Sequence, residues 1–255
     1  METLSPQCSP SAVAHLLGST ESTHLLYHPK YTDLAESSSS LSPSTPLIQL
    51  PTLPSLSSSN PFDPSWPPNP INPNHTSHIF HTSGTSGTPK PIPHFHLAEV
   101  FCLPRRPLGH HDTLQAAFTT TPLFHGGVSD LLRGWMARST VLFYPSSTSA
   151  ITAKSIVDSV NACQPLADTS GEPKITSFLS VPYILTLLSP ASDSKDTHGA
   201  TKLLASMEIV STGGAPLDTA VGNGLVDAGV RLVSRLGSSE CGCKSSSIAN
   251  RISLV

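Results

Sequence analysis

Strand-like and helix-like segments alternate from residue 77 to residue 236, and few architectures accommodate such an order. Runs rich in β-branched and apolar residues, which are typical of strands, occupy residues 77–82, 140–144, 175–181, 207–211 and 230–236. Apolar residues at helical spacing indicate helices at 128–137, 153–160, 182–188 and 217–228. Strands that alternate with helices form a mostly parallel sheet flanked by helices. The sequence therefore predicts an α/β fold.

The first 76 residues lack this alternation. Residues 1–36 contain two short apolar patches, and we interpret them as the start of an N-terminal subdomain. Residues 37–76 are rich in serine and proline, and we expect little regular structure there because proline removes a backbone donor and fixes φ. A disordered linker and a long ordered loop over a neighbouring domain are both compatible with this composition.

Composition and charge argue against several functional classes. Charged residues make up 12% of the 255 residues, the formal net charge is −3, and lysines and arginines are spread along the chain, so we expect no basic face for nucleic acid. The N-terminus lacks a basic region followed by a long apolar run, which argues against a signal peptide. No stretch approaches the roughly 18–20 apolar residues that span a bilayer. Because five irregularly spaced cysteines are typical of free thiols, we expect a cytoplasmic protein.

A run of glycine, serine and threonine follows the strand expected at 77–82 and ends on a lysine. Its residues are Thr82, Ser83, Gly84, Thr85, Ser86, Gly87, Thr88, Pro89 and Lys90. Small residues leave backbone N–H groups accessible, hydroxyls add donors and the lysine adds a positive charge, which together suit a polyphosphate. The run does not match the Walker A pattern, and for a glycine- and serine-rich loop in general the alternative is a flexible turn.

The string HTSGTSGTPKP at residues 81–91 resembles the phosphate-binding loop of the adenylate-forming superfamily. This superfamily includes acyl-CoA synthetases, peptide-synthetase adenylation domains and luciferases. Pro91 replaces the glycine that usually follows the lysine. The continuation PKPI is similar to that of fungal peptide-synthetase-like carboxylic acid reductases. The resemblance implies that this loop holds the β- and γ-phosphates of ATP.

A second block that resembles the superfamily lies at residues 121–127, which read TPLFHGG. In the superfamily this block falls between a strand and a helix, and its histidine lines the carboxylate pocket. The resemblance therefore implies a catalytic role for His125. A lone histidine in a chain is more often structural, so the position within the block carries this prediction.

Two more blocks follow in the order that the superfamily has. Residues 210–217 read VSTGGAPL and resemble a turn in which Gly213, Gly214 and Ala215 lie against adenine and the acyl group, because glycine has no Cβ. Residues 236–240 read LGSSE, which implies that Ser239 contacts phosphate and that Glu240 binds Mg²⁺, a metal that favours oxygen ligands. Leu236 replaces the aromatic residue that usually lies beside adenine.

The resemblance implies an enzyme that uses ATP and Mg²⁺ to convert a small carboxylic acid into an acyl-adenylate. In the complete family the acyl group passes to the thiol of CoA or of a phosphopantetheine-bearing carrier-protein domain. Residues 77–242 correspond to the AMP-binding α/β core of the large N-terminal domain. Residues 243–255 are polar and aperiodic, and we interpret them as an irregular tail.

Several blocks of the superfamily are not visible after Glu240. These are an aspartate that binds the ribose, a hinge, and a mobile C-terminal subdomain with a lysine that stabilises developing charge. We therefore expect a truncated domain, and an inactive nucleotide-binding pseudoenzyme is the alternative to an active ligase. A serine hydrolase is a weaker alternative, because the segment 124–127 resembles an oxyanion loop but the chain has no G-x-S-x-G motif.

Overall fold

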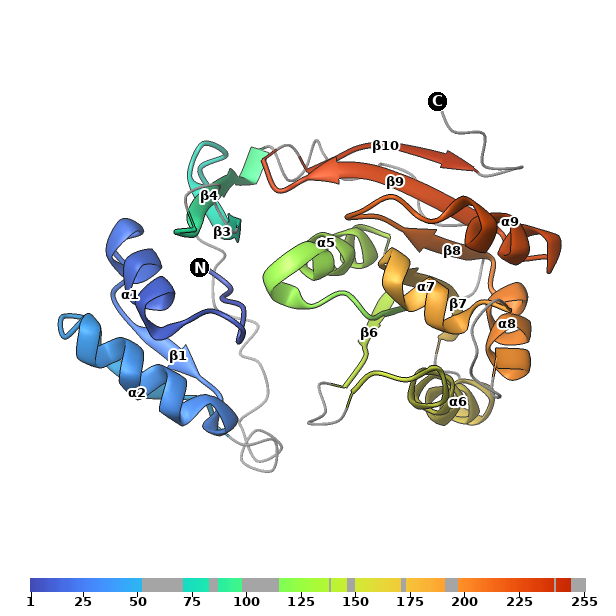
Figure 1. Ribbon diagram of the computed structural model, residues 1–255, viewed down its shortest axis with the longest axis horizontal. Helices are drawn as coiled ribbons and strands as arrows, with labels where there is room; N and C mark the ends of the chain where they lie inside the picture. The colour runs from blue at the N-terminus through green and yellow to red at the C-terminus, as the bar shows by residue number, and fades with distance from the viewer. Residues whose placement is uncertain are drawn as a thin grey trace. The chain divides into compact units, whose positions relative to one another are not determined.

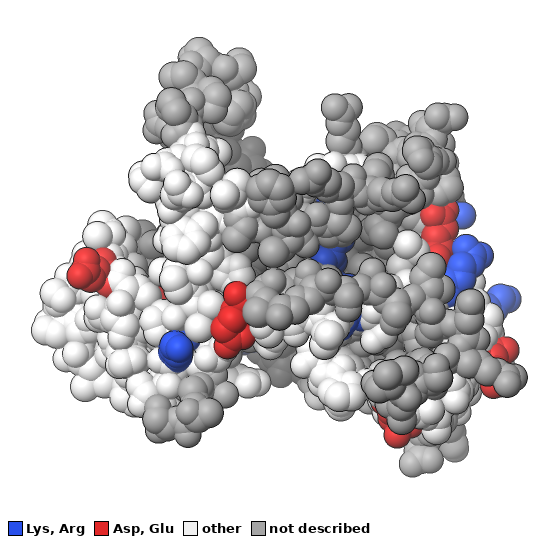
Figure 2. All heavy atoms as spheres, turned by 90° about the horizontal axis from the view of Figure 1, so that it is seen from above, with Lys and Arg blue, Asp and Glu red and all other residues white. Residues whose placement is uncertain are grey.

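The computed structural model describes residues 1–51, 71–82, 87–97, 115–137, 139–145, 150–170, 173–190, 197–240 and 242–248. The chain forms two compact units, Met1–Ala98 and Glu99–Val255 (Figure 1). Among the described helices none is both long and apolar enough to cross a bilayer. On the face drawn in Figure 2, charged side chains of both signs are present among many uncharged ones.

The first unit begins with two helices and a pair of short parallel strands. These elements are α1 (Pro10–Ser19), β1 (Leu25–Tyr27), the 3-10 turn η1 (Pro29–Tyr31), α2 (Thr32–Leu41) and β2 (Leu47–Gln49). Ser9 caps α1, because its hydroxyl accepts a hydrogen bond from the amide of Ala12 at 3.2 Å. Leu16 and Leu17 of α1 are buried together with Ala35 of α2. The helix α2 therefore extends into the serine-rich stretch for which we expected little regular structure.

A β-hairpin completes the described part of the first unit. β3 (Thr76–Thr82) confirms the strand expected at 77–82, and it pairs antiparallel with β4 (Lys90–Phe95). β4 carries two prolines, which lack the amide donor that a central strand needs and which hid this strand from the sequence pattern. β4 tolerates them because it pairs with β3 alone in a two-stranded sheet. Thr82 and Lys90 are register partners, so they close the base of the loop between the strands.

The second unit contains the predicted sheet. Five strands are parallel to one another: β5 (Gln115–Thr119), β6 (Thr140–Phe143), β7 (Lys174–Ser180), β8 (Ile209–Thr212) and β9 (Leu232–Ser238). The spatial order is β10-β9-β8-β7-β5-β6. β10 (Gly242–Ile248) is antiparallel to β9 and forms where the sequence suggested an irregular tail. The α/β fold and its mostly parallel sheet are confirmed.

Helices follow the strands as the alternation predicts, but the sequence pattern indicated neither the strand β5 nor the helix at 197–206. They are the π-helical turn η2 (Leu123–Gly127), α5 (Val128–Met136), α6 (Ala153–Ser170), α7 (Pro182–Leu188), α8 (Thr197–Ser206) and α9 (Thr219–Asp227). The helices α6, α7 and α8 pack against one another (Figure 1). The core lies against this group, and its centre is a row of register partners across four strands. This row comprises Phe118, Phe178, Val210 and Leu232, each at most 1% exposed.

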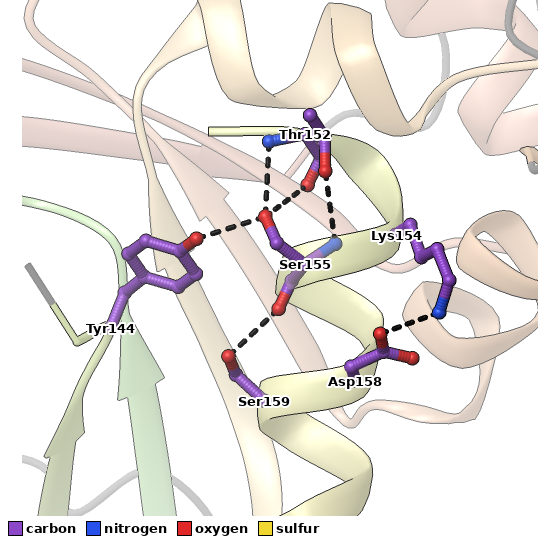
Figure 3. A network of polar contacts seen from close by, with 6 residues as sticks. All are labelled: Tyr144, Thr152, Lys154, Ser155, Asp158 and Ser159. Carbon is purple, nitrogen blue, oxygen red and sulfur yellow. Dashed lines mark hydrogen bonds and ion pairs between the residues drawn. The ribbon is translucent and has the colours of Figure 1, made fainter. Parts of the chain in front are cut away.

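A reciprocal pair of hydrogen bonds starts α6 (Figure 3). The hydroxyl of Thr152 accepts from the amide of Ser155 at 3.1 Å, and the hydroxyl of Ser155 accepts from the amide of Thr152 at 3.0 Å. This arrangement satisfies amides that lack partners within the helix. The phenol of Tyr144 also donates to the hydroxyl of Ser155 at 2.9 Å, which ties the helix start to the segment that follows β6.

Gly134 is predicted to be essential for packing α5 against β6. A Cβ at this position would collide with Cγ2 of Val141. Gly134→Ala should lower the free energy of unfolding by about 1–3 kcal/mol, as overpacking does in cores. Adding Val141→Ala removes the colliding methyl and should recover part of that loss. Gly224→Ala in α9 is the control, because nothing lies within 4 Å of its added Cβ, and it should stabilise by roughly 0.5–1 kcal/mol. Denaturant titration measures the free energy of unfolding of the wild type, of Gly134→Ala with and without Val141→Ala, and of Gly224→Ala. Equal losses for the two single glycine variants would contradict the packing.

Glu2 should make the stability of the first unit depend on pH. Burial raises the pKa of its carboxyl from 4.5 to about 7, although the hydroxyl of Thr20 donates to it at 3.3 Å. Between pH 4.5 and 7 the folded form retains a proton that the unfolded chain loses. The contribution of this group to the free energy of unfolding is therefore fully present below pH 4.5 and is lost as the pH rises through 7. Glu2→Gln should raise the melting temperature more at pH 8 than at pH 5. Glu36→Gln at an exposed site of α2 is the control; the same gain for Glu2→Gln at both pH values would refute the effect.

Candidate functional site

The predicted site residues of the second unit gather at one edge of its sheet. β5 pairs with β6 on one side and with β7 on the other, so the chain reverses its direction of travel across the sheet at this point. In open α/β sheets, ligands bind at the carboxyl ends of the strands beside such a switch point. The turns after β5, β8 and β9 carry all the predicted site residues of this unit. The topology therefore brings three separate blocks of sequence to a common edge.

The turn after β5 carries His125. The amides of His125 and Gly127 both donate to the carbonyl of Pro122 at 3.0 Å, which folds the chain into a tight π-helical turn. His125 departs from helical geometry, with φ −126° and ψ −137°, and its side chain is exposed. Gly127 is buried, and a Cβ there would lie 2.5 Å from the carbonyl oxygen of Thr121. The second glycine of the FHGG string is thus required by the close approach of the backbone.

Hydroxyl side chains line the switch point itself. The hydroxyls of Thr120 and Ser180 lie 2.9 Å apart and join the end of β5 to the end of β7. Within the described part of the chain, three further buried hydroxyls near this edge have no hydrogen-bond partner. They belong to Thr121, Ser211 and Thr212. Sequence reasoning did not single out these hydroxyls, although Thr121, Ser211 and Thr212 lie within the blocks at 121–127 and 210–217.

The turn after β8 carries the two predicted glycines and Ala215. Gly213 is half-buried, and a Cβ there would lie 3.1 Å from the carbonyl oxygen of Arg235 on β9. Gly214 has φ +90°, a conformation that favours glycine. Backbone geometry therefore favours glycine at both positions. Gly214 and Ala215 are exposed, which leaves the outer side of the turn accessible to a ligand.

The end of β9 carries Ser239 and Glu240. Ser239 is half-buried and Glu240 is exposed. Among the described residues no three histidine, cysteine, aspartate or glutamate side chains cluster to hold a metal. One exposed carboxylate with an adjacent hydroxyl fits Mg²⁺ that arrives with a nucleotide, because protein-bound Mg²⁺ usually takes one or two carboxylates and fills its shell with phosphates and water. Leu236, at the position of the missing aromatic residue, is 66% exposed.

A buried carboxylate near this edge was also missed from the sequence. Asp130, in the first turn of α5, is 1% exposed. Its Oδ2 accepts from the hydroxyl of Thr119 at 2.9 Å, and its Oδ1 accepts from Arg133 at 3.2 Å and from Arg235 at 2.8 Å. Asp130 therefore links β5, α5 and β9. Its partner on β9 is distant in sequence, so no local pattern indicates the contact.

The predicted phosphate loop belongs to the first unit. Thr82 and Lys90 face each other in the hairpin, and Gly87, Thr88 and Lys90 are exposed. Gly87 has φ +81° and open space around its Cα, so its backbone is accessible to a ligand. Exposed small residues and an exposed ammonium group fit a polyphosphate. Four predicted members lie outside the described residues, namely Ser83, Gly84, Thr85 and Ser86.

Comparison with known families identifies a match over nearly the whole chain. Residues 2–252 match the model of the AMP-binding enzyme family. The non-canonical non-ribosomal peptide synthetase ascB from Acremonium egyptiacum is 31% identical over 161 residues. The adenylate-forming reductase stbB from Stachybotrys bisbyi is 29% identical over 157 residues. Each alignment covers 60% of this chain and 13% of the relative, so the matched part is a small fraction of either relative.

Solved structures show the same fold at low identity. A benzoate CoA ligase from Burkholderia xenovorans has a TM-score of 0.73 at 15% identity, and the match covers 98% of this chain and 48% of the ligase. An o-succinylbenzoate CoA synthetase from Bacillus subtilis, in complex with ATP and magnesium, has a TM-score of 0.68 at 17% identity. That match covers 96% of this chain and 46% of the synthetase. The chain thus spans about half the length of these structures.

The two glycines of the turn after β5 should respond differently to substitution. Gly127→Ala places a Cβ 2.5 Å from the carbonyl oxygen of Thr121 and should cost about 1–3 kcal/mol of unfolding free energy. Gly126→Ala is the matched control, because its Cβ would meet only the methyl of Thr121 at 3.4 Å. Urea unfolding of both variants gives the comparison. A loss at Gly126 as large as that at Gly127 would contradict the turn geometry.

Proposed function

This chain belongs to the family of AMP-binding enzymes, and we propose that it binds ATP with Mg²⁺ and contributes to the activation of a small carboxylic acid as an acyl-adenylate. The observation that carries the proposal is the gathering of the turns after β5, β8 and β9 at the carboxyl edge of one parallel sheet. That edge is where α/β folds bind nucleotides.

We assign the phosphates of ATP to the loop at 82–90. Gly87 and Thr88 offer accessible backbone and hydroxyl donors, and Lys90 supplies a charge that neutralises phosphate oxygens. Thr82 supports this role as the register partner of Lys90 at the loop base. Ser83, Gly84, Thr85 and Ser86 would complete the set of donors. The Bacillus subtilis synthetase that shares the fold was solved with ATP and magnesium, which is consistent with this ligand.

We assign the remaining ligand groups to the sheet edge. Adenine and the acyl group would lie against Gly213, Gly214 and Ala215, where two glycines leave the backbone open. Ser239 would contact phosphate, and Glu240 would hold Mg²⁺ through its exposed carboxylate. When bound, the metal would neutralise charge on the phosphates. The chain's own contribution is then to position the reactants, which is the main requirement of such transfers.

His125 would lie beside the carboxylate of the acid substrate. Its side chain is exposed on a turn that three backbone features fix. These are two hydrogen bonds from backbone amides to the carbonyl of Pro122 and the buried Gly127. An imidazole on a fixed turn can orient a carboxylate by donating a hydrogen bond. We propose CoA or a phosphopantetheine-bearing carrier protein as the acyl acceptor of the complete protein.

Removing the charge of Lys90 should weaken ATP binding. Lys90→Ala deletes a charge-assisted contact and should raise the Kd for ATP roughly 10- to 150-fold, since such a contact contributes roughly 1.5–3 kcal/mol. Lys154→Ala is the matched control, because Lys154 is an exposed lysine paired with Asp158 on α6 (Figure 3). Titration calorimetry with ATP and Mg²⁺ measures both. Equal affinity of wild type and Lys90→Ala would refute the loop assignment.

Removing the charge of Glu240 should affect the metal more than the nucleotide. Glu240→Gln should reduce the gain in ATP affinity that Mg²⁺ produces, because an amide oxygen is a weaker ligand than a carboxylate. ATP affinity without Mg²⁺ should stay near the wild-type value. Glu36→Gln is the control at an exposed site of the first unit. An unchanged Mg²⁺ gain in Glu240→Gln would remove the metal assignment.

Carboxylate-dependent pyrophosphate exchange then separates an active ligase from a protein that binds nucleotide without turnover.

A further inference from the structure

Asp130, Arg235 and Thr119 form a buried polar contact that we call the Asp130 clamp. Asp130 is 1% exposed and Thr119 is fully buried, while the side chain of Arg235 is 17% exposed. Each carboxylate oxygen has its own partner across the sheet: Oδ2 accepts from Thr119 on β5 at 2.9 Å, and Oδ1 accepts from Arg235 on β9 at 2.8 Å. Arg133, on the same helix as Asp130, adds a contact at 3.2 Å.

The clamp joins strands that the sheet itself does not join. β7 and β8 lie between β5 and β9, so no backbone hydrogen bonds run between these two strands. With strands about 4.8 Å apart, the axes of β5 and β9 are on the order of 14 Å from each other. The carboxylate on α5 and the long side chain of Arg235 cover this distance. β5 and β9 are thus tied through a single buried group.

The clamp also joins the bases of two of the three turns assigned to the ligand. Asp130 is in the first turn of α5, directly after the turn that carries His125. Arg235 is on β9, shortly before Ser239 and Glu240. Thr119 adds a second tie, because its hydroxyl accepts from the amide of Thr121 at 3.1 Å at the start of the His125 turn. A displacement of either segment would therefore stretch contacts to the other.

The chemistry of the clamp favours fixed geometry over net stability. Burying a carboxylate requires that its oxygens be paired, and the gain from pairing is largely offset by the loss of hydration. Such pairs impose a specific arrangement, because a shifted partner leaves a buried charge uncompensated. Two oxygens with partners on different strands define the position of α5 relative to both β5 and β9.

We propose that Asp130 and Arg235 are positioning residues that hold the His125 turn and the Ser239–Glu240 strand end in fixed register. This inference rests on the proposed function for its consequence, since the two segments are assigned to the acid and to the metal. Breaking the clamp should loosen both segments and lower the gain in ATP affinity that Mg²⁺ produces. The core row of Phe118, Phe178, Val210 and Leu232 should stay intact.

Hydrogen exchange measured by mass spectrometry on the full chain tests the coupling without a ligand. Arg235→Met should speed exchange about tenfold in the peptide covering 123–129, although the substitution is on β9. Asp130→Asn, which keeps the shape of the side chain, should speed exchange in the peptide covering 236–240. Exchange at 175–180 should not change, which shows that the fold persists. Arg235→Lys, which retains a positive charge, should restore part of the protection.

Lys154→Met is the matched control, because it breaks the exposed Lys154–Asp158 pair at 2.7 Å. It should leave both peptides unchanged. Faster exchange confined to the substituted element, in both clamp variants, would overturn the clamp. So would faster exchange that is uniform across 175–180 and the two peptides, since that pattern reports general destabilisation.

ATP titration with and without Mg²⁺ on the same variants separates this inference from the proposed function. With a wild type that binds ATP, a reduced Mg²⁺ gain in Asp130→Asn supports the positioning role, and an unchanged gain overturns it. A wild type that fails to bind ATP refutes the proposed function, and the exchange measurement then decides the clamp alone. The two failures therefore give different results.

Discussion

Parallel pairing of β5 with both β6 and β7 is the constraint on which the rest of the second unit depends. Together with the parallel pairing of β8 and β9, it places the turns after the five parallel strands at one edge, so that blocks distant in sequence become neighbours there. The buried row through Phe118, Phe178, Val210 and Leu232 fixes the register, because a slip by one residue would move each side chain to the opposite face. This register therefore determines where the turns that carry the site residues lie.

Backbone geometry explains why three of the motif glycines are glycines. A Cβ on Gly127 would collide with the carbonyl oxygen of Thr121, and a Cβ on Gly213 would lie tightly against the backbone of Arg235. Gly214 adopts a positive φ. These reasons hold before any ligand is considered, so the glycines do not themselves prove a nucleotide site. They do explain how two turns can come close to the sheet edge while leaving exposed backbone for a ligand.

Much of the fold could be predicted from sequence because its signals are local. The strands at β3, β6 and β7 and the helices at α5 and α7 follow from β-branched runs and helical spacing, and the order of motifs indicated the family. β4 was not predicted because its two prolines argue against a strand, and they are tolerated only where a strand pairs with one neighbour. The Asp130 clamp was not predicted because Asp130 and Arg235 are far apart in the chain, and no sequence pattern near either residue indicates a contact with the other. Long-range polar contacts of this kind depend on topology, which periodicity does not encode.

We propose that nucleotide and metal bind at the carboxyl edge of the parallel sheet. Amide resonances recorded while Mn²⁺ is titrated in the presence of ATP test it most directly, because a paramagnetic ion broadens nearby signals. The account predicts ATP-dependent broadening at Gly213, Ser239 and Glu240, with Lys174 at the amino end of β7 unaffected. Broadening at Lys174 with sharp signals at Ser239 and Glu240 would contradict it.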